Sequence, residues 1–169
     1  FRDRIGIIGQ LLKYEVFDIY LASFIKYENI TGYVSKKLIT ILKNKYIHLG
    51  SNLETARNIL EGHNSDIIFY PDIGMKLKTY LLSYSRIAKI QITTWGHSET
   101  SGLNSIDYYI SSNYFHNSNS LSTNQYFTEK LILMPSLSTY YISPIIMLLH
   151  GNMKSFKNRV ELGFKDSDN

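Results

Sequence analysis

Apolar residues recur along the chain in two patterns, one typical of helices and one typical of buried strands. Residues 5–14 and 34–42 carry apolar side chains three or four positions apart, which predicts two amphipathic helices. Shorter runs that are rich in branched and aromatic residues predict strands. Strands are expected at 17–24, 46–49, 66–70, 90–95, 106–111 and 130–133.

Further helices are expected between these strands. Ser51 and Glu54 form a capping-box pattern, so a helix should follow them, continue to Glu61 and end at Gly62. Pro71 should end the strand before it, because proline has no amide proton to donate to a neighbouring strand. Additional helices are expected at 75–84, 123–129 and 155–162.

The alternation of helices and strands predicts an α/β fold, namely a Rossmann-like parallel sheet with helices on both faces. Sheets of this type begin with a strand that lies in the middle of the sheet, whereas the first element predicted here is a helix. An unusual topology and a first strand located before Phe1 are both open explanations, and we favour the second. Residues 1–150 are then interpreted as a partial Rossmann-like lobe.

The composition narrows the classes of function. The 169 residues suit one domain, and the lack of Cys excludes disulfides, a thiolate nucleophile and a zinc–thiolate site. The 18 Lys and Arg residues are spread along the chain and the net charge is only +4, so we expect no nucleic-acid partner. The apolar stretch 142–149 is too short to span a membrane, and the His residues show no metal-ligand spacing. Neither a membrane nor a metal is therefore expected.

The segment from Trp95 to Gly102 carries the most information about function. It combines two glycines, three hydroxyl side chains and His97, and it directly follows a predicted strand. Ligands of open α/β sheets bind at the edge where the strands end. Glycine lets backbone amides approach an anion or a sugar there, and histidine can exchange a proton near neutral pH. The same composition also fits an ordinary connection, and His97 also fits a structural role.

A second loop, Tyr70 to Met75, has the same placement after the preceding strand. Within it, Asp72 and Gly74 are candidate binding residues that would line the same cleft. Asp72 alternatively caps the following helix, since a carboxylate can accept hydrogen bonds from the first amides of a helix.

Residues 89–102, followed by residues 106–111, resemble a signature of the protein O-GlcNAc transferase family, in which a Gly-Tyr-Pro-Gly-Thr-Ser-Gly loop precedes Asp-Tyr-Ile. Residues 66–74 and 126–135 are similar to two further segments of that family. The resemblance implies the N-terminal lobe of a two-lobed GT-B enzyme. Such an enzyme transfers N-acetylglucosamine from UDP-GlcNAc to Ser or Thr hydroxyls of a protein, without a metal or other cofactor. Residues 151–169 are interpreted as a linker to a C-terminal lobe that holds the nucleotide sugar.

The resemblance carries over to Gly96, Thr100, Ser101 and Gly102 as residues of a loop that faces the donor, whereas the family has Tyr-Pro-Gly in place of residues 97–99. By the chemistry of its own side chain, His97 would act as a base or as a hydrogen-bond donor to the sugar. Glu99 would place negative charge near a diphosphate, which is unfavourable unless its side chain points away. The residues expected to bind the substrate are Gly96, Ser98, Thr100, Ser101, Gly102, Asp72 and Gly74.

The His-Ser-Glu form of the loop is similar to divergent members from giant DNA viruses. The abundance of Ile, Asn, Lys and Tyr, with Ala only at positions 22, 56 and 88, is typical of an AT-rich genome and fits that origin. A viral member would act in the cytoplasm of the host cell.

Three hypotheses for the function follow from these observations. The first is a fragment of a UDP-sugar-dependent glycosyltransferase, inactive on its own, whose partners are a nucleotide sugar and a protein acceptor. The second is a relative that has lost transfer and serves as a binding or scaffold module. The third is an unrelated α/β receiver or sugar-binding domain.

Overall fold

The computed structural model describes residues 4–42, 44–116 and 123–140. Within these ranges parallel strands alternate with helices, from α1 (Ile5–Leu11) to β6 (Lys130–Met134). The predicted helix at 155–162 and the predicted linker at 151–169 lie outside the described residues.

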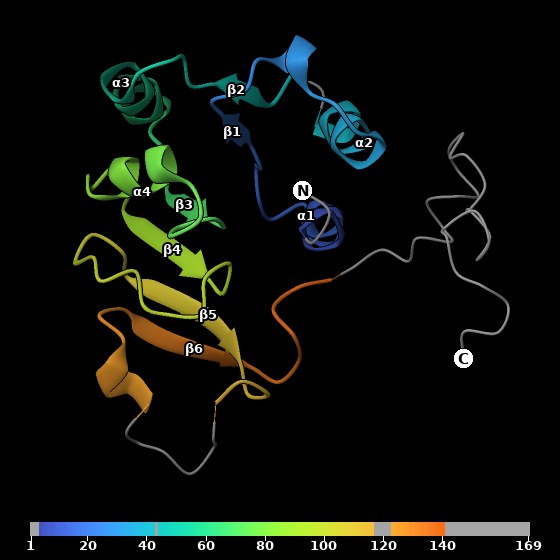
Figure 1. Ribbon diagram of the computed structural model, residues 1–169. Coiled ribbons are helices and arrows are strands. Elements are labelled where there is room, and N and C mark those ends of the chain that lie inside the picture. Colours follow the sequence, from blue (N-terminus) through green and yellow to red (C-terminus); the bar gives the residue numbers. More distant parts are fainter. Residues whose placement is uncertain (1–3, 43, 117–122, 141–169) are drawn as a thin grey trace, which may run out of the picture.

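The described strands form two parallel sheets (Figure 1). Strands β1 (Leu21–Ser23) and β2 (Tyr46–His48) form the smaller sheet. The larger sheet contains, in this order, β3 (Ile67–Tyr70), β4 (Ile90–Thr94), β5 (Tyr108–Ser112) and β6. Because each of these four strands runs parallel to the next, their carboxyl ends meet at one edge of the sheet.

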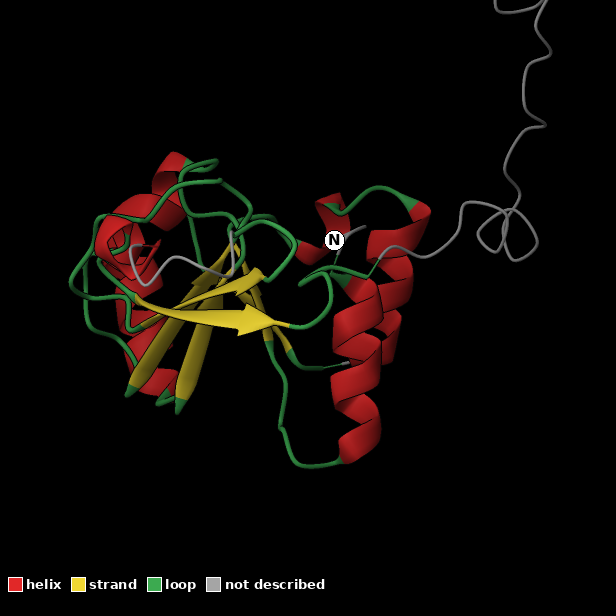
Figure 2. Cartoon of the chain, turned by 90° about the horizontal axis from the view of Figure 1, so that it is seen from below, coloured by secondary structure: helices red, strands yellow, loops and turns green. Residues whose placement is uncertain are grey.

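Helices lie on both sides of the strands, as Figure 2 shows. On one side, α1 packs against α2 (Tyr33–Leu42). On the other side lie α3 (Leu53–His63) and α4 (Leu77–Ser83), and short 3₁₀ turns occur at Leu12–Tyr14, Tyr27–Asn29 and Thr123–Tyr126. No helix in the described part of the chain has the length and apolar character that crossing a membrane requires. This architecture confirms the predicted Rossmann-like α/β fold.

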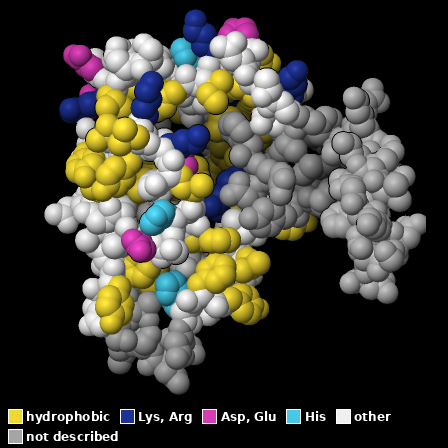
Figure 3. All heavy atoms as spheres, in the orientation of Figure 1, with side chains coloured by type: hydrophobic (Ala, Val, Ile, Leu, Met, Phe, Trp, Pro, Cys, Tyr) yellow, Lys and Arg dark blue, Asp and Glu magenta, His cyan; other side chains and the backbone are white. Residues whose placement is uncertain are grey.

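The main core lies between α3, α4 and the smaller sheet. Leu49, Ala56, Leu60 and Leu82 form its buried centre, and burial of each leucine contributes roughly 1.5–3 kcal/mol. A second buried cluster, which includes Tyr70, joins β3 to the loops that follow β3 and β4. Large apolar side chains nevertheless remain on the surface, where Figure 3 shows them in several patches.

The strand predicted at 17–24 is shorter than expected. Only three of its residues pair with β2, in register with Tyr46 to His48. Phe17 and Tyr20 are 48% and 41% exposed, so the prediction of a buried strand over the whole run is wrong. Aromatic composition favours a strand only where a neighbouring strand is present to pair with the backbone, and β2 offers just this short stretch.

Strand β3 forms where the sequence predicts it but is buried on one face only. Tyr70 is buried and Ile68 packs against the second core cluster, whereas Ile67 and Phe69 are each 43% exposed. Because side chains alternate between the two faces of a strand, the face that carries Ile67 and Phe69 lacks the cover typical of a parallel sheet.

The N-cap of α3 is Asn52 rather than Ser51. The side-chain oxygen of Asn52 accepts a hydrogen bond of 2.7 Å from a backbone amide in the first turn of the helix. The helix also continues through Gly62 to His63, and its C-cap is Asn64, whose φ of 52° is left-handed. Asparagine tolerates this conformation better than most residues, so the helix does not end at the predicted glycine.

We expect Asn52→Ala to lower the free energy of unfolding by about 1 kcal/mol, because the first turn loses its acceptor. Ser51→Ala is the matched control and should change that free energy by less than about 0.5 kcal/mol, since this exposed side chain does not cap the helix. Urea denaturation of the complete protein measures both. Equal losses in the two variants would show that Ser51 shares the capping role.

Candidate functional site

Two loops meet at the edge of the sheet where β3 and β4 end. Gly96, after β4, lies so close to the loop after β3 that a Cβ atom on it would be 2.4 Å from the carbonyl oxygen of Pro71. Gly74, whose φ is +84°, faces His97, and a Cβ atom on Gly74 would lie 3.0 Å from the Cγ atom of that ring. A side chain at either glycine would push the loops apart, so both glycines are required for this contact.

The two loops enclose a cavity of about 180 Å³ at this edge. Four of the residues predicted for the site line it, namely Gly74, His97, Thr100 and Ser101. Glu99 lines it as well, together with Tyr109 of β5. Pockets that enclose a whole drug-sized ligand measure about 300–1,000 Å³, so this cavity can hold only part of a larger molecule.

The other predicted site residues lie around the cavity rather than in its wall. Gly96 makes the loop contact described above, and Ser98 is exposed. Gly102 has a φ of +70°, and its amide donates a hydrogen bond of 3.1 Å to Oγ1 of Thr100. Gly102 therefore belongs to the turn that ends the loop.

Asp72 does not cap α4. The N-cap of that helix is Lys76, and no side chain accepts a hydrogen bond there. The carboxylate of Asp72 instead accepts a long hydrogen bond of 3.4 Å from Oγ1 of Thr79. Asp72 is half-buried next to Ile73, which lines the cavity, and this burial raises the pKa of its carboxyl group above its ordinary value.

The loop after β4 is fixed by the buried carboxylate of Glu129, the residue before β6. Its Oε1 atom accepts a hydrogen bond of 2.8 Å from the amide of Ser101 and another from the hydroxyl of the same residue. Its Oε2 atom accepts a hydrogen bond of 2.6 Å from the hydroxyl of Thr100. Burial by itself would raise the pKa of Glu129, but these hydrogen bonds outweigh it and hold the pKa below its ordinary value.

Two of the three hydroxyl groups that the sequence offered for ligand binding are thus already engaged, whereas that of Ser98 is exposed. Thr100 and Ser101 both donate to Glu129, and Oγ1 of Thr93 donates to the carbonyl of Tyr70 at 2.9 Å. These side chains shape the cavity wall, which leaves backbone groups, the carboxylate of Glu99 and the ring of His97 as the more accessible polar groups of the lining.

His97 is exposed, and its ring makes no hydrogen bond to another residue within the described ranges. Its backbone carbonyl accepts a hydrogen bond of 2.6 Å from the hydroxyl of Tyr109. Burial raises the pKa of Tyr109 to about 12, so its phenol keeps its proton at neutral pH and holds this carbonyl in place.

Two residues of the segments that carry the family resemblance, Gln91 and Asp107, hold the fold together and do not line the cavity. Gln91 is fully buried, and its side chain accepts from the amide of Ile87 at 2.9 Å and donates to the carbonyl of Ser105 at 2.8 Å. Asp107 accepts from the amide of Gln91 at 2.7 Å and from Arg86 at 2.6 Å. Both residues lie at the amino edge of the sheet, opposite the cavity.

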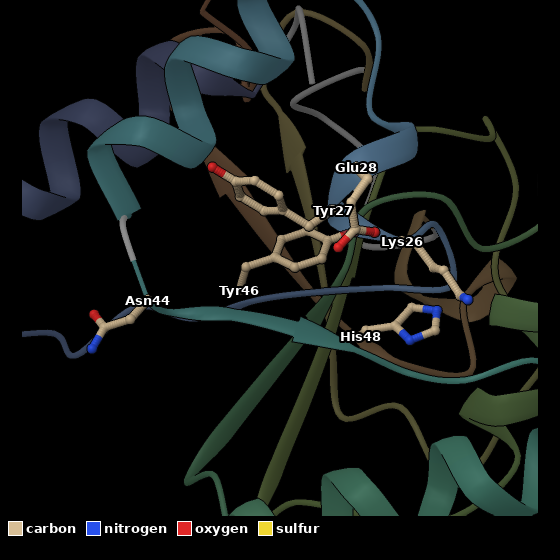
Figure 4. A pocket seen from close by; sticks show the side chains of 6 residues that line it. All are labelled: Lys26, Tyr27, Glu28, Asn44, Tyr46 and His48. Carbon is tan, nitrogen blue, oxygen red and sulfur yellow. The ribbon is translucent and has the colours of Figure 1, made fainter.

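A second cavity, of about 650 Å³, lies beside the smaller sheet. Figure 4 shows the six side chains around it, from Lys26, Tyr27, Glu28, Asn44, Tyr46 and His48. The rings of Tyr27 and Tyr46 meet edge to face with centroids 5.9 Å apart. Most of the lining is exposed, so this cavity is a hollow of the surface. Among the described residues, no three His, Cys, Asp or Glu side chains are grouped so that they could hold a metal ion.

Sequence reasoning missed Glu129 and Tyr109 as residues of the site. Glu129 is 28 residues away from its partner Ser101, and no local pattern links the two. Its only signal is its position directly before a predicted strand, within the segment 126–135 that carries part of the resemblance. In the sequence, nothing distinguishes Tyr109 from the other aromatic residues of the predicted strands.

Comparisons with known proteins relate the chain to glycosyltransferases. No protein-family profile matches the chain. Over 95 residues, 56% of the chain, it is 27% identical to the UDP-glucose:protein N-β-glucosyltransferase of Actinobacillus pleuropneumoniae serotype 5b. The enzyme of the same name from serotype 7 is 28% identical over 95 residues.

The fold is similar to that of a mutant O-GlcNAc transferase from Thermobaculum terrenum, with a TM-score of 0.63 and 13% identity over 80% of the chain. The match confirms the prediction of a Rossmann-like half of a GT-B fold. The chain covers only 14% of each glucosyltransferase and 26% of the solved chain. The viral origin stays a prediction.

We expect Glu129→Gln to lower the free energy of unfolding by roughly 1.5–3 kcal/mol, because the amide nitrogen of Gln cannot accept the hydrogen bonds that the carboxylate accepts. Glu99→Gln is the matched control, since Glu99 is exposed, and should change this free energy by less than about 0.5 kcal/mol. Urea denaturation of the complete protein compares them. Similar losses would contradict the role of Glu129.

The contribution of Glu129 should also depend on pH. Because its folded-state pKa is lowered, the stabilisation is complete above the unfolded-state value of about 4.3 and is lost as the pH falls through the folded-state value. The difference in unfolding free energy between the wild type and Glu129→Gln should therefore shrink progressively as the pH falls below about 5. A difference that stays constant over this range would contradict a lowered pKa.

Proposed function

We propose that the chain is part of a glycosyltransferase that transfers a sugar from a UDP-sugar to a protein acceptor. The observation that carries this proposal is the cavity between the two loops, because open parallel sheets bind ligands at the carboxyl edge of their strands. The similarity to two enzymes named as UDP-glucose:protein glucosyltransferases and the fold of an O-GlcNAc transferase support the same class of reaction.

For the donor we propose UDP-GlcNAc, and for the acceptor a Ser or Thr hydroxyl, as the resemblance of residues 89–102 implies. The names of the sequence relatives make UDP-glucose and a nitrogen acceptor the competing pair. The two pairs differ in the group at carbon 2 of the sugar and in the acceptor atom, so a direct comparison of donors separates them.

In this reaction the acceptor oxygen forms a bond to the anomeric carbon, and the bond from that carbon to the diphosphate breaks. UDP leaves with the electron pair, and the acceptor proton passes to a base. We propose His97 as this base or as a donor to the sugar, because its ring lines the cavity and is not tied to another described residue. Tyr109 orients the backbone of His97 through the hydrogen bond to its carbonyl.

The nucleotide is expected to bind mainly elsewhere. A cavity of about 180 Å³ is too small for a whole nucleotide sugar, so this lobe would contact the sugar while a second lobe would hold the UDP group. No metal is part of the proposal, and stabilisation of the departing diphosphate would come from that second lobe.

A binding module without transfer is the second candidate, and Glu99 favours it. The carboxylate of Glu99 lines the cavity, where it would repel a diphosphate group that came near. The hydroxyls of Thr100 and Ser101 are also engaged with Glu129 instead of facing a ligand.

Titration of the complete protein with UDP-GlcNAc and, separately, with UDP-glucose tests the proposal. We expect a heat of binding and release of UDP when protein acceptors are present. His97→Ala should lower turnover by roughly 10²–10⁴-fold with little change in donor affinity if His97 is the base. His48→Ala, a half-buried histidine of the smaller sheet, is the control and should keep full turnover.

The possible results separate the candidates. A folded protein that gives no heat with either donor would favour the binding module. Turnover that is unchanged in His97→Ala would remove the proposed role of that residue and leave the class of reaction intact.

A further inference from the structure

The surface hollow beside the smaller sheet is built on a paired strand and an anchored turn. Tyr46 and His48 lie two positions apart on β2, so their side chains project from the same face of that strand. The 3₁₀ turn after β1 supplies Tyr27 and Glu28, and it is followed by Ile30, which is buried. The hollow shares no described lining residue with the cavity between the two loops, so the two are separate.

Two tyrosine rings form the apolar part of the hollow. The hydroxyl of Tyr46 donates a hydrogen bond to the carbonyl of Ile25, which fixes the orientation of the Tyr46 ring. The ring of Tyr27 meets this ring edge to face at an interplanar angle of 74°, and Tyr27 remains 53% exposed. An aromatic ring that is both held and exposed offers a flat apolar surface to a ligand and loses little side-chain entropy when the ligand binds.

The polar side chains of the hollow are available to a ligand. Within the described residues, the side chains of four lining residues make no hydrogen bond and no ion pair, namely those of Lys26, Glu28, Asn44 and His48. Figure 4 shows Asn44 at one end of the hollow and Lys26 and His48 at the other, with the two rings between them. The ammonium group only donates and the carboxylate only accepts, whereas the amide does both. The hollow therefore offers unused donors and acceptors around an apolar surface.

The mixture of charges disfavours ligands that carry a single charge. Glu28 would repel a phosphate group or a nucleic-acid backbone, and Lys26 would repel a cation. A wholly apolar ligand would remove water from these polar groups without giving them hydrogen bonds in exchange. A neutral sugar meets neither obstacle, because its hydroxyls both donate and accept while the C–H groups of its ring pack against an aromatic face.

We propose that the hollow binds a neutral sugar, with one face of the sugar ring on Tyr27 and its hydroxyls directed to the surrounding polar groups. The volume of about 650 Å³ lies within the range of about 300–1,000 Å³ that is typical of small-molecule sites. This inference does not depend on the proposed transfer reaction, because it requires binding alone and involves other residues.

Saturation-transfer NMR on the complete protein tests the binding with four neutral sugars, namely glucose, N-acetylglucosamine, cellobiose and N,N′-diacetylchitobiose. We expect at least one of them to bind with a Kd on the order of 1 mM, the affinity expected of a small polar ligand. A disaccharide that binds several-fold more tightly than its monosaccharide would identify a unit of a glycan as the ligand, and equal affinities would identify a free sugar. No binding of any of the four at about 50 mM would overturn the proposal.

Glucose 6-phosphate distinguishes a sugar site from an anion site. Because Glu28 opposes a phosphate group, this probe should bind no more tightly than glucose. Binding that is tenfold tighter than that of glucose would show that the phosphate is recognised, and it would overturn the assignment of a neutral ligand.

Substitutions locate the bound sugar. Tyr27→Ala should weaken binding of the best of the four sugars by about tenfold, and Tyr27→Phe, which keeps the ring, should stay within about twofold of the wild type. Tyr14→Ala is the matched control, because this tyrosine is 70% exposed and lies outside the hollow. An equal loss in Tyr14→Ala would contradict the assignment.

The same titration separates this inference from the proposed function. His97→Ala alters only the cavity between the two loops, so the affinity of the hollow for the sugar should stay unchanged. Binding that is lost in His97→Ala but kept in Tyr27→Ala would place the sugar in the first cavity. That result would overturn the inference drawn here and leave the proposed function intact.

Discussion

The buried carboxylate of Glu129 accepts hydrogen bonds from two consecutive residues of the loop after β4, and the candidate site depends on this contact. The parallel strands place the loop at the carboxyl edge of the sheet, but strand pairing alone does not determine the conformation of the loop. Glu129 favours a single conformation of the loop, because a buried carboxylate is stable only where hydrogen-bond donors surround it. Gly74 and Gly96 then allow the neighbouring loop to close on it.

This arrangement divides the polar groups between structure and ligand binding. The hydroxyls of Thr100 and Ser101 hold the loop, so in the proposed reaction recognition of the sugar would fall to backbone groups and to His97. A loop held in advance loses little conformational entropy when a ligand binds, which favours affinity. The small cavity fits a lobe that contacts one part of a large substrate while the rest binds elsewhere.

The sequence predicted the elements well where the signal is local. Strands β3, β4 and β6 and helix α2 lie within a few residues of their apolar runs, because periodicity depends on neighbours in the chain. The N-cap of α3 was predicted at Ser51 and lies at Asn52, its neighbour, because both residue types are good caps. Strand β1 is short because its length depends on a partner far away in sequence. Glu129 was missed for the same reason.

A map of donor binding by hydrogen exchange tests the central claim most directly, which is that the loop from Gly96 to Gly102 contacts the sugar. The complete protein is compared with and without saturating UDP-GlcNAc or UDP-glucose. The account predicts slower exchange at amides of this loop and at Gly74. A donor that binds but slows exchange only elsewhere, such as around the hollow between Tyr27 and His48, would contradict it.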